Sequence, residues 1–172
     1  MNSIKLYALA LLPLLAVAPP SKRDTHADVV STIAAFKEKD PGIGKFFDTA
    51  IGYAVFPTVG KGAIGVGGAH GTGELLVGGK AMGKASLNQL TVGLQLGGEA
   101  YSEIIFFEQQ STLDGFKNGD FAFAAQATAV AITAGASANA AYRNGVAVFT
   151  MTKGGLMYEA SIGGQKFSFK PY

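Results

Sequence analysis

The sequence has 172 residues, which is enough for one domain with a single hydrophobic core and a short N-terminal extension. Hydrophobic residues make up 48% of the chain and charged residues 15%, so the composition indicates a folded protein and argues against intrinsic disorder. The net charge of +2, with no run of more than two basic residues, argues against nucleic-acid binding. The absence of cysteine excludes disulfides, thiolate metal sites, thiol catalysis and a lipoprotein anchor.

The N-terminus has the pattern of an export signal. Lys5 precedes an apolar run over residues 6–17, and Ala16-Val17-Ala18 is a small-x-small cleavage site. The apolar run is shorter than the roughly 20 residues that span a bilayer. Because Pro19 would impede cleavage after Ala18, cleavage elsewhere nearby and a retained interfacial anchor are alternatives. We predict a signal peptide over 1–18, a linker over 19–27 and one domain over 28–172, exported and periplasmic or envelope-associated.

Two helices are predicted after the linker. Over residues 25–39 apolar side chains recur at helical spacing, at Val29, Val30, Ile33 and Phe36. Pro41 ends this pattern, since the residue before a proline is disfavoured in the α region. Asp40-Pro41 then predicts the N-cap and first position of a second, short helix. A helical turn or a third, short helix is predicted over 111–118, ended by Gly119.

From Tyr53 onward the period changes to two, which predicts strands. Residues 53–56 form a short strand that Pro57 closes, and residues 104–107 form a continuous apolar strand typical of a buried position. Residues 87–96 alternate, which predicts a half-buried strand with Leu90 on its apolar face and Gln89 on the other.

The C-terminal third is predicted to continue the sheet. Residues 146–151 and 156–162 are expected to pair as a hairpin through Lys153-Gly154-Gly155, and residues 165–170 to add an edge strand. Residues 121–142 carry no charge, but alanine and polar residues make membrane insertion marginal, so a strand followed by a buried loop is favoured. The fold class predicted is α+β, with a glycine-rich, predominantly antiparallel sheet or barrel-like core and N-terminal amphipathic helices packed on it.

Glycine is enriched, with 24 residues of which thirteen lie between Gly60 and Gly98. Residues 60–65 match the dinucleotide pattern G-x-G-x-x-G, but the residues that follow will not form the helix that this site requires. Residues 78–85 nearly match a phosphate loop, with Ala85 where Ser or Thr would hold magnesium. Both stretches are interpreted as glycine-rich turns and strands.

The sequence contains no clear pattern of catalytic or metal-binding residues. His26 and His70 lie far apart and neither has a second ligand at metal spacing. Glu99, Glu103 and Glu108 could act as paired carboxylates, but solvated strand ends explain them more simply. We therefore predict no enzyme, no metal and no cofactor, and keep a hydrolase using His70 as a minor alternative.

A lipid-binding site is the remaining interpretation. It combines the apolar helix face with lysines beside predicted glycine turns, by the logic of interfacial helices. The predicted contacts are Val29, Ile33, Phe36, Lys37, Lys61, Lys80, Lys84 and Lys153. The lysines would form an anionic-headgroup patch if the hairpins bring them to one end; otherwise they are ordinary solubilising residues.

Several motifs in series resemble the SYLF-domain family. They are the stretch 53–68 with its Phe56-Pro57 turn and Lys61-Gly62 step, the Phe116-Lys-x-Gly-x-Phe motif, the alanine-rich segment from Phe123, Lys153-Gly-Gly-Leu-Met and Gly164-Gln-Lys-Phe. The resemblance covers about residues 28–170. It implies a compact mixed fold and binding to membrane lipids, phosphoinositides in eukaryotic members, some of which also bind actin filaments.

Two functions follow from these patterns. The first is a peripheral lipid-binding module of the bacterial envelope that contacts anionic phospholipid. The second is a structural or adaptor protein that docks a protein partner on an exposed sheet edge. The helical period cannot decide whether the first helix faces lipid or core, because both arrangements have the same spacing.

Overall fold

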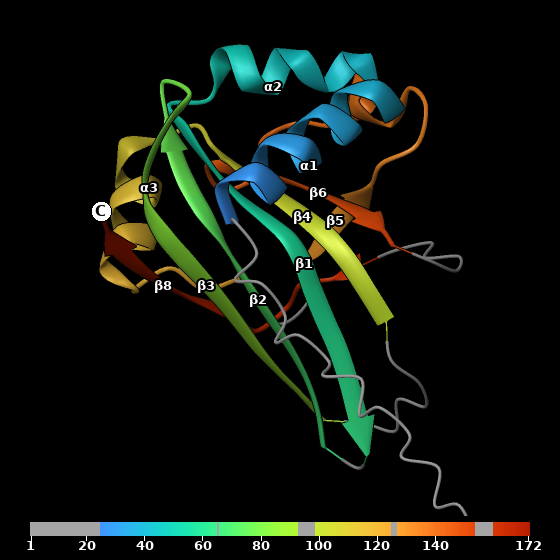
Figure 1. Ribbon diagram of the computed structural model, residues 1–172, viewed down its shortest axis with the longest axis vertical. Coiled ribbons are helices and arrows are strands. Elements are labelled where there is room, and N and C mark those ends of the chain that lie inside the picture. The colour runs from blue at the N-terminus through green and yellow to red at the C-terminus, as the bar shows by residue number, and fades with distance from the viewer. Residues whose placement is uncertain (1–24, 65, 93–98, 125–126, 154–159) are drawn as a thin grey trace, which may run out of the picture.

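The computed structural model describes residues 25–64, 66–92, 99–124, 127–153 and 160–172 (Figure 1). A sheet of eight strands in the order β7-β5-β6-β4-β1-β2-β3-β8 forms its centre. The helices are α1 (Thr25–Lys39), η1 (Pro41–Ile43), α2 (Gly44–Thr49), α3 (Gln110–Asn118) and η2 (Ala136–Asn139). The strands are β1 (Gly52–Ile64), β2 (Val66–Val77), β3 (Lys80–Val92), β4 (Glu99–Phe107), β5 (Thr128–Ala131), β6 (Val146–Thr152), β7 (Ala160–Ser161) and β8 (Gln165–Pro171).

The predicted α+β class is confirmed. All described strand pairs are antiparallel except β5 with β6. Among the described residues the sheet is open, with β7 and β8 at its edges, although a single bridge joins Ala122 to Lys166 on β8. The alternative of a closed barrel is therefore not the architecture seen.

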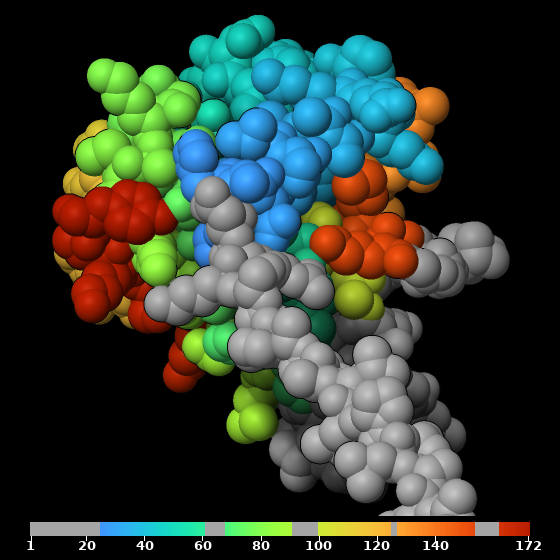
Figure 2. All heavy atoms as spheres, in the orientation of Figure 1, coloured from blue at the N-terminus to red at the C-terminus, as the bar shows by residue number. Residues whose placement is uncertain are grey.

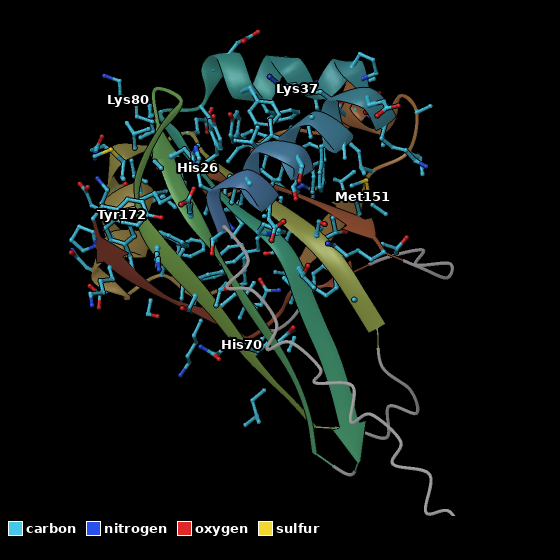
Figure 3. The ribbon with its side chains drawn as sticks, viewed as in Figure 1. His26, Lys37, His70, Lys80, Met151 and Tyr172 are labelled. Atoms are coloured by element: carbon cyan, nitrogen blue, oxygen red, sulfur yellow. The ribbon has the colours of Figure 1, made fainter. Side chains whose placement is uncertain are left out.

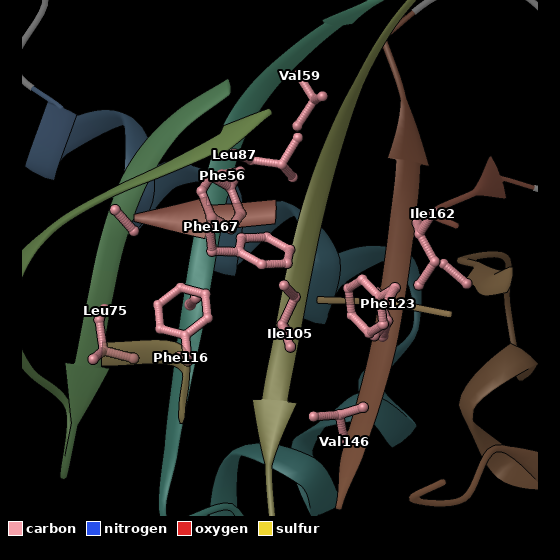
Figure 4. Packing of buried hydrophobic residues seen from close by; sticks show 14 of the residues in the cluster. Phe56, Val59, Leu75, Leu87, Ile105, Phe116, Phe123, Val146, Ile162 and Phe167 are labelled. Atoms are coloured by element: carbon pink, nitrogen blue, oxygen red, sulfur yellow. The ribbon is translucent and has the colours of Figure 1, made fainter. Parts of the chain in front are cut away.

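Two hydrophobic clusters lie on opposite faces of the sheet, because successive side chains of a strand point to opposite sides. On β4, Ile105 and Phe107 belong to one cluster and Ile104 and Phe106 to the other. The first cluster also contains residues of α3 and β8, and Figure 4 shows aromatic and aliphatic side chains of this cluster along the strands of the sheet. The second cluster is covered by α1 and α2, whose atoms cap the upper end of the molecule in Figure 2.

The N-terminal helices form as predicted. On α1, Val29, Thr32 and Phe36 are buried, which is the i, i+3, i+7 spacing of one helix face. The side chain of Asp40 accepts a hydrogen bond from the backbone N–H of Gly42 and so caps η1, which leads directly into α2. The third predicted helix is also confirmed, since α3 ends at Gly119 in a left-handed conformation.

The prediction that Pro57 ends the first strand is wrong. β1 continues to Ile64, and its pairing with both β2 and β4 shifts register around Pro57. A bulge is a place where a strand tolerates proline, because no ladder hydrogen bond is required from its missing N–H. The carbonyl of Pro57 accepts a 2.8 Å hydrogen bond from the Ser102 hydroxyl, which holds the bulge in place.

The predicted alternation of β3 is inverted. Leu90 is 74% exposed, whereas Gln89 is 4% exposed and lies on the inward face with Leu87. The Gln89 amide donates a 2.8 Å hydrogen bond to the carbonyl of Gly163, which offsets the cost of burying it. Residues 93–96, the rest of the predicted strand, lie outside the described residues.

The predicted hairpin between residues 146–151 and 156–162 is also wrong for its described part. β5 lies between β6 and β7, so these two strands flank it and do not pair with each other there. Residues 121–142 contain β5 followed by η2, close to the predicted strand and loop. Within the described ranges, no helix combines the length and the apolar character needed to cross a membrane.

The glycine-rich stretch forms strands and turns. β1 ends at Ile64, which pairs with Val66 at the start of β2, so the G-x-G-x-x-G stretch lies in a β-hairpin. Gly78 and Gly79 have positive φ and make the two-residue turn from β2 to β3. At Gly73 a Cβ would collide with the carbonyl oxygen of Val55, so glycine there permits the close approach of β1 and β2.

Candidate functional site

The predicted apolar contacts on α1 lie mostly in the core. Val29 and Phe36 are fully buried, in the cluster that includes Val55, Phe106 and Phe149. Ile33 is half-buried and packs against the same cluster. In this conformation the apolar face of the helix therefore contacts the sheet, and Val29 and Phe36 are not accessible to a membrane.

Four of the five predicted lysines lie toward one end of the sheet or the other. Lys80 begins β3, and Figure 3 places it at the same end of the molecule as Lys37 on α1. Lys61 pairs with Ala69 far along the β1–β2 hairpin, toward its opposite end. Lys153 lies near the same end. Its backbone N–H donates a hydrogen bond to the carbonyl of Ala100, and Glu99, the residue before Ala100, is paired with Lys61.

Lys84 belongs to neither end of the sheet. It lies within β3, in register with Glu74 on β2 and with Lys170 on β8. The structure thus brings Lys37 and Lys80 to one end and separates them from Lys61, Lys84 and Lys153.

The end that carries Lys37 and Lys80 has a further lysine, Lys45 on α2. The Lys37 ammonium lies 4.5 Å from the centroid of the Phe47 ring, and that of Lys45 lies 5.0 Å from the Phe46 ring. These distances are within the range of cation–π contacts. We refer to Lys37, Lys45 and Lys80 as the helical-end lysines; all three are exposed.

The geometry of this end supports a weakly basic, rigid surface. Phe46 and Phe47 pack against Phe106 with ring centroids 5.6 Å and 4.8 Å apart, so the rings below the lysines are fixed to the sheet. Two exposed carboxylates, Glu38 and Asp48, lie on the same helices and reduce the positive charge. Lys45 is not among the predicted contacts, because it lies within the second helix and not beside a predicted glycine turn.

The two histidines have structural partners. His70 lies opposite Asn88 in the β2–β3 ladder, and its Nδ1 is 2.8 Å from the Asn88 Oδ1. His26 Nδ1 lies 2.7 Å from an oxygen of Glu74, whose other oxygen accepts a hydrogen bond from the Tyr172 hydroxyl. Glu74 thereby joins the start of α1 to the C-terminal residue.

The three glutamates considered as catalytic pairs differ in environment. Glu103 is fully buried and accepts a 3.0 Å hydrogen bond from the Gln165 amide, which also lies 3.2 Å from the Tyr101 hydroxyl. Glu108 is exposed just after β4, and Glu99 begins that strand at its far end. In the part of the chain that the structure describes, no three His, Asp or Glu residues gather as metal ligands would.

The chain is similar to known proteins over most of its length. Residues 88–171 match the sequence model of the Ysc84 family, described as "Las17-binding protein actin regulator". The chain is also 30% identical over 146 residues to "Beta cell expansion factor A" from Aeromonas veronii. That alignment covers 84% of this chain and 54% of the relative, so the chain spans about half the length of this curated protein. Ysc84 is the family of the SYLF domain, and the predicted resemblance to that family is confirmed.

Proposed function

We propose, from the premise that residues 88–171 carry the Ysc84 domain of the SYLF family, that this protein is a peripheral binding module for anionic membrane lipid. The observation that carries the proposal is that Lys37 and Lys80 lie at the same end of the molecule, where Lys37 and Lys45 lie over aromatic rings of α2. A lysine near an anionic membrane surface contributes about 1 kcal/mol, so three of them give a modest, salt-sensitive attraction.

The aromatic rings beneath these lysines support the same role. Phe47 is half-buried at the surface of α2, below the Lys37 ammonium. Phenylalanine is among the apolar residues that interfacial helices bury at the boundary between headgroups and acyl chains. The exposed Val30, at 53%, adds apolar area on the outer side of α1.

Direct insertion of the apolar face of α1 is a separate step in this proposal. Because Val29 and Phe36 are buried, they can reach lipid only if α1 leaves the sheet and exposes the second hydrophobic cluster. The primary contact that we propose therefore uses the outer surface of the helices, with the core intact.

The location proposed is the bacterial envelope. It is supported by the sequence of the N-terminus, where Lys5, the apolar residues 6–17 and Ala16-Val17-Ala18 have the order of an export signal. An exported protein of this kind would meet anionic phospholipid at a membrane surface facing the periplasm.

A protein partner is the second candidate. The description of the Ysc84 family names binding to Las17 and regulation of actin, and both of these involve a protein partner. The edge strand β8 offers a backbone for strand addition. However, its outward side chains include Lys166 and Lys170, and lysines on an edge strand disfavour pairing with another chain.

Co-sedimentation with vesicles tests the proposal. A protein of residues 21–172, which lacks the apolar run of residues 6–17, would be mixed either with neutral vesicles or with anionic vesicles that contain phosphatidylglycerol. Each mixture would be measured at low and at high salt. The expected result is binding to anionic vesicles alone, weakened by salt. Failure to bind any vesicle would contradict the lipid proposal and favour a protein partner.

A further inference from the structure

The alanine-rich segment borders a cavity of about 710 Å³ beside β5 and the first residues of β6. This volume lies within the range of roughly 300–1,000 Å³ that is typical of small-molecule sites. Buried apolar side chains line its inner side, among them Ala129, Val146, Val148 and Ile162. The cavity lies apart from the helical-end lysines, none of which lines it.

Short side chains make up much of the cavity wall. Alanine recurs along residues 122–141, and the lining includes Ala124 and Ala141, which are exposed at its rim. A methyl group leaves the space that a leucine or phenylalanine would fill in a closely packed interior. The result is an apolar surface that remains accessible beside the sheet.

One basic residue is present in the described lining of the cavity. Arg143 is among the lining residues, whereas none of the described residues that line the cavity carries a carboxylate. The polar groups that accompany Arg143 are mainly amides, those of Asn139 and Asn144. The charge of the rim is therefore complementary to a single anionic group.

A tight turn fixes Arg143 relative to the apolar lining. Its N–H donates a 2.8 Å hydrogen bond to the carbonyl of Val146, and the Val146 N–H donates a 3.1 Å hydrogen bond back. Asn144 and Gly145 between them have φ of 51° and 80°, the conformation of a type I′ hairpin turn. The backbone of Arg143 is thus held opposite that of Val146, which also lines the cavity.

We propose that this cavity binds one single-chain anionic amphiphile, with its acyl chain on the apolar lining and its carboxylate at Arg143. This ligand is a single dissolved molecule that enters the cavity. It is therefore distinct from the bilayer surface that the proposed function involves. An arginine suits this position because it stays charged at all relevant pH values and binds carboxylates in a planar geometry.

Isothermal titration calorimetry of the full chain with decanoate and with the neutral decanol, each below its aggregation limit, tests the proposal. The expected result is saturable binding of one decanoate per chain, about fivefold tighter than decanol, as an exposed ion pair allows. Arg143→Gln should remove this preference and leave decanol binding unchanged. Ala141→Phe and Ala124→Phe should weaken both ligands by occupying the cavity.

Matched controls use positions outside the cavity. Ala34→Phe adds an exposed phenylalanine on α1, and Lys170→Gln removes an exposed charge on β8; both should bind decanoate as the unmodified chain does. Circular dichroism of every variant identifies any that fails to fold, and the remaining variants decide the outcome. Absence of saturable decanoate binding, or unchanged binding in the folded cavity variants, would overturn the proposal. Vesicle binding that persists in Arg143→Gln would show that the two sites are independent.

Discussion

The carboxylate of Asp40 accepts a 2.7 Å hydrogen bond from the backbone N–H of Ser137, 97 residues further along the chain. Its other oxygen accepts the hydrogen bond from Gly42 that caps η1. Asp40 is only 2% exposed, so one buried carboxylate ties the connection between α1 and α2 to η2. The surface that carries Lys37 and Lys45 is therefore anchored to the alanine-rich segment.

This relationship predicts a pH dependence of stability. Hydrogen bonding, chiefly from the Ser137 N–H, lowers the pKa of Asp40 from its ordinary value of 3.8. A carboxyl group with a lowered pKa in the folded state stabilises the fold above its unfolded pKa, and this contribution is lost as the pH falls through the folded pKa. The free energy of unfolding, measured in urea at several pH values below 5, should therefore fall more steeply in the unmodified chain than in Asp40→Asn. Equal slopes would show that Asp40 does not contribute in this way.

The burial of Phe36 predicts that Phe36→Asp unfolds the protein or destabilises it severely. The substitution removes a fully buried aromatic ring and places a charge in the second hydrophobic cluster, at a cost of about 3 kcal/mol or more. Val30→Asp, on the exposed side of the same helix, should change the free energy of unfolding by less than about 0.5 kcal/mol. Denaturation of both variants checks this; a stable Phe36→Asp would mean that α1 is not held against the sheet.

The close approach of β1 and β2 predicts that Gly73→Ala is strongly destabilising. Its Cβ would collide with the Val55 carbonyl oxygen, so two paired strands would have to move apart. Gly60→Ala provides a matched control in the neighbouring strand, since nothing lies within 4 Å of a Cβ there. Thermal unfolding should show a large loss for Gly73→Ala and a small change for Gly60→Ala. Similar unfolding temperatures would contradict the close packing at Gly73.

Local patterns of the sequence predict the helices well but not the inward face of every strand. The helical spacing of Val29, Ile33 and Phe36 and the cap at Asp40 depend on neighbours in sequence, so the sequence predicts them directly. On β3, by contrast, Leu90 and Gln89 exchange their expected faces. The bond from Gln89 to Gly163, 74 residues away, is a tertiary interaction that the alternation of the strand does not contain.

The candidate site shows the same limit. The sequence identifies exposed lysines, but their grouping depends on strand direction, which places Lys80 at one end of the sheet and Lys61 toward the other. Likewise, the apolar period of α1 is the same for a core helix and a membrane-facing one. The burial of Phe36 in the cluster that includes Phe106 and Phe149 decides between them, and those residues lie far along the chain.

The most direct test of the lipid proposal compares two triple variants of residues 21–172 in vesicle co-sedimentation. One variant replaces the helical-end lysines Lys37, Lys45 and Lys80 with glutamine, and the other replaces Lys61, Lys84 and Lys153. Both remove the same total charge, so they differ only in where the charge lies. At about 1 kcal/mol per lysine, the first variant should bind anionic vesicles about 100-fold more weakly, and the second should bind nearly as the unmodified chain does. Equal weakening of the two variants would contradict binding through the helical end.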